Sequence, residues 1–136
     1  MVSGNVLFVG DDLCARADVL KHVGYKVARC ACDADALGQA LRHPVDAVLF
    51  QCRPEPPSEA VLSTCRALTN APILLFEDHN SSANPRLFDV VVPNLCNPRD
   101  WLLELAQMIG SSRERELSKS PQAASPDLQT TRKETA

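Results

Sequence analysis

The chain has 136 residues, of which 45% are hydrophobic, and its formal net charge is −3 at pH 7. This length and apolar content fit one domain with one core. Its basic residues form no long run, which argues against nucleic-acid binding through phosphates, and no apolar run approaches the roughly 20 residues that span a bilayer. An acidic pair follows the first apolar run too early for a signal peptide, so we expect a cytoplasmic protein.

Short apolar runs alternate with amphipathic segments along most of the chain. The runs predict five buried strands, at residues 5–10, 25–31, 45–51, 73–76 and 88–92. Capping residues, together with Gly24 and Pro44 as stop signals, predict four helices. These helices lie after Asp11 and Asp12, after Cys32 or Asp33, from Ser58 to Leu68, and from Asn97 to Ile109.

The composition changes at Ser111. Residues 111–136 contain no aromatic and almost no aliphatic side chains. Such a segment buries too little surface to offset the entropy lost on ordering. We therefore predict a domain over residues 1–110 and a disordered polar tail over 111–136.

The alternation of continuous apolar strands with helices is typical of a parallel sheet covered on both faces. We predict the α/β class, with a flavodoxin-like doubly wound sheet of five parallel strands and a shortened region between strands four and five. In such sheets, function lies outside the carboxyl ends of the strands. The residues expected there are Gly10, Asp11, Asp12, Gln51, Glu77, Val92, Pro93 and Asn94.

Five stretches together resemble a response-regulator receiver domain of two-component systems. They are VLFVGDD, YKVARCACDADALGQAL, VDAVLFQCRPEPP, APILLFE and DVVVPNLCNPRDWL, and the resemblance covers residues 5 to about 110. It implies a phosphoryl-accepting aspartate at the end of the third strand and acids after the first strand that help to bind magnesium. It also implies a Thr or Ser after the fourth strand and a Lys after the fifth.

The sequence departs from the receiver pattern at the position of the acceptor. Gln51 stands there, and an amide cannot form the acyl phosphate that a carboxylate forms. The acid of the third strand, Asp46, lies five residues earlier, which is about 16 Å along a strand. Asp46 is therefore expected at the opposite end of the sheet.

The remaining receiver positions also differ. The acidic pair is represented by Gly10 and Asp11, or by Asp11 and Asp12 if the alignment moves by one residue, and Glu77 falls at the Thr/Ser position. Val92, Pro93 or Asn94 falls at the lysine position. The four lysines of the chain lie elsewhere, at Lys21, Lys26, Lys119 and Lys133.

The expected function is a pseudo-receiver, a receiver-like module that acts by binding a signalling protein without aspartyl phosphorylation. We expect no enzymatic activity, no cofactor and no binding to nucleic acid or membranes, and binding through the face from strand four to the last helix. Whether the chain is a monomer or a homodimer stays open. The alternatives are a stand-alone response regulator phosphorylated on Asp11 or Asp12, and a small flavodoxin-like ligand-binding or redox protein.

Three further features of the sequence have two interpretations each. Asp11 and Asp12 are either weak magnesium ligands or caps of the first helix. Trp101 either anchors a partner or packs on the sheet edge. The six cysteines are predicted to be reduced thiols, most simply small buried hydrophobes, rather than metal or redox sites; they are Cys14, Cys30, Cys32, Cys52, Cys65 and Cys96.

Overall fold

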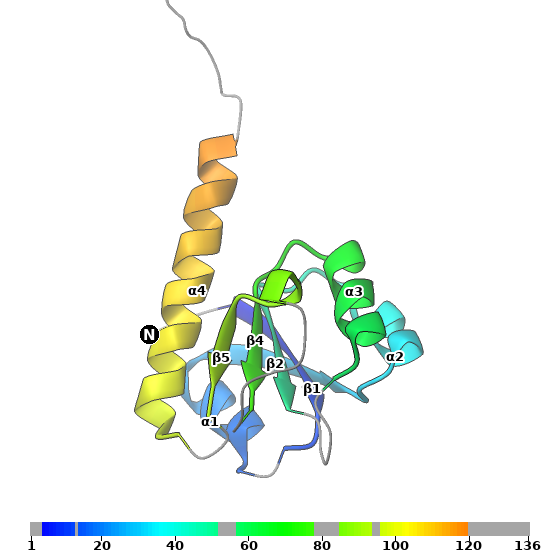
Figure 1. The fold of residues 1–136 in the computed structure, drawn as a ribbon. Coiled ribbons are helices and arrows are strands. Elements are labelled where there is room, and N and C mark those ends of the chain that lie inside the picture. The colour runs from blue at the N-terminus through cyan, green and yellow to red at the C-terminus, as the bar shows by residue number, and fades with distance from the viewer. Residues whose placement is uncertain (1–3, 13, 52–56, 78–84, 94–95, 120–136) are drawn as a thin grey trace, which may run out of the picture.

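Five parallel strands form one sheet in the order β2-β1-β3-β4-β5 (Figure 1). The computed structural model describes residues 4–12, 14–51, 57–77, 85–93 and 96–119, with side chains described up to residue 115. The predicted α/β fold with a five-stranded parallel sheet is confirmed. The elements are β1 (Gly4–Gly10), α1 (Arg16–Val23), β2 (Tyr25–Cys30), α2 (Ala34–Ala40), β3 (Ala47–Gln51), α3 (Glu59–Leu68), β4 (Ile73–Phe76), the 3₁₀ turn η1 (Pro85–Leu87), β5 (Val90–Val92) and α4 (Pro98–Lys119).

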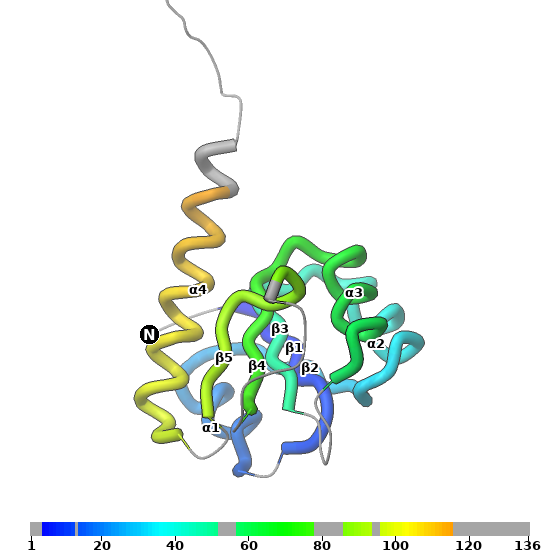
Figure 2. Tube along the Cα trace, in the orientation of Figure 1, coloured from blue at the N-terminus to red at the C-terminus, as the bar shows by residue number. Residues whose placement is uncertain are grey.

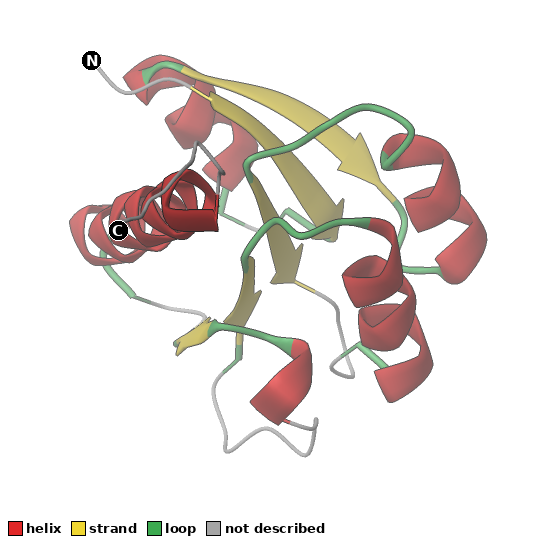
Figure 3. Ribbon diagram, turned by 90° about the horizontal axis from the view of Figure 1, so that it is seen from above, coloured by secondary structure: helices red, strands yellow, loops and turns green. Residues whose placement is uncertain are grey.

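Both faces of the sheet are buried, each in its own apolar cluster. Successive side chains of a strand point to opposite faces, so Phe8, Leu49 and Phe76 pack with α1 and α4 on one side. Val9 and Phe50 pack with α2 and α3 on the other side. Figure 3 shows the resulting three layers from above. Two-sided burial explains why the strands read as continuous apolar runs.

Polar side chains cap the helices where the sequence predicts them. Each cap accepts a hydrogen bond from a backbone N–H of the first turn, at 2.7 to 3.2 Å, and so satisfies a group that has no partner within the helix. The accepting side chains are Asp12 for α1, whose N-cap residue itself is Ala15, and Asp33, Ser58 and Asn97 for α2, α3 and α4.

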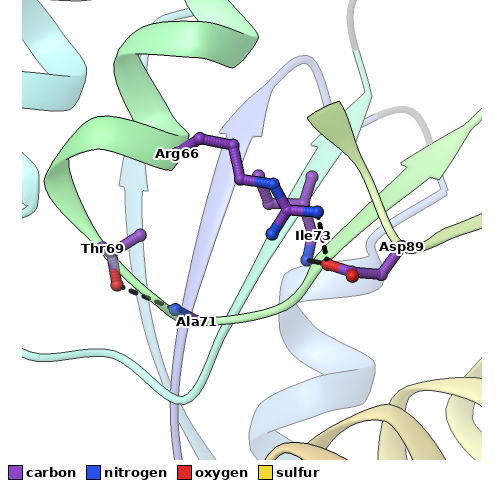
Figure 4. Close-up of polar contacts among 5 residues, drawn as sticks. All are labelled: Arg66, Thr69, Ala71, Ile73 and Asp89. Atoms are coloured by element: carbon purple, nitrogen blue, oxygen red, sulfur yellow. Dashed lines mark hydrogen bonds and ion pairs between the residues drawn. The ribbon is translucent and has the colours of Figure 1, made fainter. Parts of the chain in front are cut away.

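One aspartate, Asp89, anchors the end of the connection between β4 and β5. Asp89 accepts a hydrogen bond from the backbone N–H of Ile73 at 2.7 Å and forms an ion pair with Arg66 of α3 at 3.1 Å (Figure 4). The N–H of Asp89 donates in return to the carbonyl of Ile73 at 2.8 Å. In the described part of this connection the helical element is the three-residue turn η1, so Asp89 ties β5 directly to β4 and α3.

The last helix extends beyond the predicted end of the domain. That boundary lies after Gly110, whereas α4 continues to Lys119. The coloured part of α4 in Figure 2 already projects past the sheet. The structure thus differs from the tail predicted over residues 111–119, because a helix already anchored by packing gains one hydrogen bond per added residue without a new nucleus. Arg113 also pairs with Asp46 at 3.4 Å. Residues 120–136 lie outside the described part.

Replacing Asp89 with alanine should lower the free energy of unfolding by about 1–3 kcal/mol, because the N–H of Ile73 loses its charged acceptor. Replacing Arg66 with alanine is the matched control. It removes only the partly exposed ion pair and should cost at most about 1 kcal/mol. Urea unfolding of both variants measures the difference. Equal losses in the two variants would contradict the role assigned to the Asp89 hydrogen bond.

Candidate functional site

The carboxyl ends of the central strands meet at one edge of the sheet, which we call the rim. Gly10 of β1 is paired in register with Gln51 of β3, and the N–H of Asp11 donates to the carbonyl of Gln51 at 2.8 Å. The N–H of Glu77, after β4, donates to the carbonyl of Val92 in β5 at 2.8 Å. The structure therefore brings the predicted site residues together, except Asn94, which lies outside the described residues.

Gln51 is the last residue of β3, and its side chain is 1% exposed. The alternation along β3 directs it to the same face as Ala47 and Leu49, toward α1 and α4. A neutral amide can stay buried there if it is hydrogen-bonded, whereas a carboxylate at the same place would need a compensating charge. The rim thus has a neutral group at its most enclosed position.

The three acids of the rim have different environments. Asp11 is exposed, whereas Asp12 is half-buried and uses its two carboxylate oxygens to accept from Arg16 N and Ala17 N, at 2.7 and 3.0 Å. Asp12 thus satisfies two backbone N–H groups at the start of α1, as a cap would, although the N-cap residue is Ala15. Glu77 is half-buried, and its Oε2 accepts no hydrogen bond from the described residues. Within those residues, no group of three or more His, Cys, Asp or Glu side chains could hold a metal ion.

A buried arginine lies beside the rim. The side chain of Arg16, the first residue of α1, is 2% exposed, and its guanidinium carbon lies 3.9 Å from the ring centroid of Phe76. The same carbon lies 5.9 Å from the ring centroid of Trp101 in α4, and the two rings meet edge to face at 5.6 Å. Cation–π contacts of this kind are strongest when they are shielded from water. Arg16 therefore joins α1, β4 and α4.

Arg16 was not among the residues selected from the sequence. A positive residue in the first turn of a helix is unfavourable for the helix dipole, and Arg16 is one turn before the buried Leu20. A positive charge at a helix start, on the same face as a buried leucine, could have indicated from the sequence that Arg16 is buried. Trp101 is 1% exposed and belongs to the apolar cluster under β4 and β5, so its interpretation as a partner anchor is wrong and its packing against the sheet is confirmed.

The cysteines are not all reduced. Cys32, two residues after the end of β2, is disulfide-bonded, which corrects the prediction of six free thiols. The prediction failed because spacing along a sequence does not report which cysteines lie close in space. Four cysteines are free: Cys14, Cys30, Cys65 and Cys96.

Burial sets the properties of the free thiols. Cys65 is fully buried, and desolvation raises its pKa to about 12. The pKa of the Cys96 thiol is also raised, mainly by burial. The Arg16 guanidinium opposes this rise, whereas Asp100 and Cys14 add to it.

No family model and no curated protein sequence matches the chain. Solved structures do. NtrX from Brucella abortus in complex with ATP superposes with a TM-score of 0.73 at 18% identity, over 96% of this chain and 32% of that one. The chain therefore spans about a third of NtrX.

Two isolated receiver domains match over nearly their whole length. The receiver domain of the sensor histidine kinase PA1611 from Pseudomonas aeruginosa, which has a magnesium ion in its active-site cleft, gives a TM-score of 0.60 at 21% identity, over 80% of this chain and 99% of that one. The signal receiver domain of a LuxO-type repressor from Vibrio parahaemolyticus gives 0.66 at 14% identity, over 88% and 99%. The chain has the receiver-domain fold.

One further observation concerns membranes. Among the described helices, none combines the length and the apolar character that a bilayer-spanning segment needs.

Replacing Arg16 with alanine should lower the free energy of unfolding by about 2–4 kcal/mol, through loss of the aromatic contacts and creation of a cavity. The matched control is Arg29→Ala, because Arg29 is exposed and its guanidinium carbon is 5.9 Å from the ring of Phe8. This variant should lose less than about 1 kcal/mol. Chemical denaturation followed by the fluorescence of the single tryptophan, Trp101, measures both. A loss for Arg16→Ala no larger than for Arg29→Ala would contradict this role.

Proposed function

We propose that this chain is a pseudo-receiver, which transmits a signal by binding a protein partner and does not take up a phosphoryl group on an aspartate. The observation that carries the proposal is the buried Gln51 at the end of β3, the position of the phospho-acceptor in the receiver resemblance. An amide nitrogen does not form an acyl phosphate, and the side chain has almost no access to solvent. We propose no catalytic activity and no cofactor for the chain.

The charges of the rim support the same proposal. Acceptance of a phosphoryl group brings negative charge, which a nearby lysine would neutralise. At the end of β5 the described residues are Val92 and Pro93. The buried cation beside the rim is Arg16, whose guanidinium carbon lies over the ring of Phe76, the last residue of β4. Glu77 adds a further negative charge where the family has a hydroxyl.

The partner surface in this proposal is the face formed by β5 and α4. A groove of about 290 Å³ runs between them, lined by residues that include Asp89, Glu104 and Arg115. The exposed residues that line it carry charges of both signs, and Val90 and Met108 add apolar surface. β5 is also an edge strand of the sheet. A partner with both charged and apolar groups fits such a surface.

Incubation with acetyl phosphate and Mg²⁺ should leave the intact mass of the chain unchanged, because an amide stands at the end of β3. Beryllofluoride with Mg²⁺ should likewise leave the fluorescence of Trp101 unchanged. A receiver domain with an acceptor aspartate is the positive control. A stable gain of one phosphoryl group would overturn the proposal, and peptide mapping to Asp11 or Asp12 would establish the alternative of an atypical phosphorylated regulator.

The partner surface has a separate test. Affinity capture with the whole chain as bait should retain a protein that the Glu104→Arg variant loses, because the substitution reverses a charge that lines the groove between β5 and α4. The matched control is Glu59→Arg on α3, where an exposed acid is reversed on the other side of the sheet. A partner that both variants retain, or that only Glu59→Arg loses, would place the interaction elsewhere.

A further inference from the structure

The outward face of α4 carries a large exposed hydrophobic side chain. In Figure 1, α4 lies along one side of the molecule, and no other described element covers the side of it that faces away from the sheet. Leu103 is 56% exposed, more than any other large hydrophobic side chain of the described residues. Beside it, an apolar groove of about 440 Å³ extends toward α1, lined by residues that include Val23, Tyr25, Leu102 and Ala106. Apolar surface of this kind marks an interaction site.

Gly110 lies on the same face of α4, two turns after Leu103. Glycine inside a helix is less favourable than alanine, and a Cβ added at Gly110 would meet no other atom within 4 Å. Packing within the described chain therefore gives no reason for glycine at this position. A second helix that approaches closely does give one, because the missing side chain leaves room for a large side chain of that helix.

Charged residues of opposite sign lie at the two ends of this face. Arg99 comes one turn before Leu103, and Glu114 comes one turn after Gly110. Both are exposed, and within the described residues neither side chain forms an ion pair inside the chain. At 3.6 residues per turn, the four positions fall within about 60° of the helix circumference. One face of α4 thus carries, in order, a cation, a leucine, a glycine and an acid.

This order matches itself when the helix is reversed. In an antiparallel pair of α4 helices with a two-fold axis between residues 106 and 107, Arg99 lies opposite Glu114 of the second copy. The same axis places Leu103 opposite Gly110 of the second copy, because both pairs of positions are centred on the same point of the helix. A two-fold interface needs a surface that is self-complementary in this way.

We propose that two copies of this chain form an antiparallel dimer through the outward face of α4, in which each Leu103 packs over Gly110 of the other copy and each Arg99 pairs with its Glu114. This dimer goes beyond the proposed pseudo-receiver function and does not depend on it. The groove proposed for a signalling partner is lined by other residues of α4, among them Glu104.

Analytical ultracentrifugation of the full chain tests the dimer. The wild-type chain should pass from monomer to dimer as its concentration rises. Leu103→Glu should weaken the association by about tenfold or more, because a carboxylate would be buried against the second copy. A wild-type chain that stays monomeric at every concentration at which it is soluble would overturn the proposal.

Gly110→Leu separates loss of the dimer from loss of the fold. The added side chain takes the place of Leu103 of the second copy, so the association should weaken. The monomer should resist denaturant at least as well as the wild type, because leucine favours a helix and meets open space at this position. Dimerisation as strong as that of the wild type would contradict the close approach at Gly110.

Exchange of the charges tests the antiparallel arrangement. Arg99→Glu sets acid against acid and Glu114→Arg sets cation against cation, so each variant alone should associate about tenfold more weakly. A mixture of the two variants should dimerise as readily as the wild type, because every glutamate then lies opposite an arginine. The matched control Glu59→Arg, on the other side of the sheet, should dimerise like the wild type. A mixture that fails to associate, or single variants that dimerise undiminished, would overturn the proposal.

Discussion

Burial of the sheet on both faces is the constraint on which the rest of the structure depends. The interior side chains of the strands contribute to one of two apolar clusters, so polar groups are confined to the ends of the strands. Among the described residues, the buried polar side chains are Arg16 and Gln51. Both lie at the carboxyl end of the sheet, on the side of α1 and α4. The buried polar side chains of the described residues therefore lie at one end of the sheet.

Arg16 links the structural elements that surround this region. The guanidinium lies over Phe76 and beside Trp101, and the backbone N–H of the same residue donates to Asp12. One residue thus connects the loop after β1 with β4 and α4. The rim thus combines a buried cation that contacts two aromatic rings with a neutral amide at the end of β3. This arrangement agrees with the proposal that the rim takes up no phosphoryl group.

The order of elements could be predicted from the sequence, whereas the contacts between them could not. Continuous apolar runs predicted the parallel sheet, and the capping side chains predicted the helix starts, because both signals are local. Arg16 was missed because its stabilisation comes from rings that lie far away in the sequence. The same limit applies to Cys32, whose disulfide no spacing along the chain reveals. Residues 111–119 are helical because of the packed turns before them, which composition alone does not record.

The length of α4 has a mechanical consequence. Its 22 residues span about 33 Å, from the rim to past the opposite end of the sheet. The helix is held at one end by Trp101 and further along by Arg113, which pairs with Asp46. A helix held in this way leaves the sheet in a fixed direction, so a group attached after its last turn would be kept away from the rim, beyond the opposite end of the sheet.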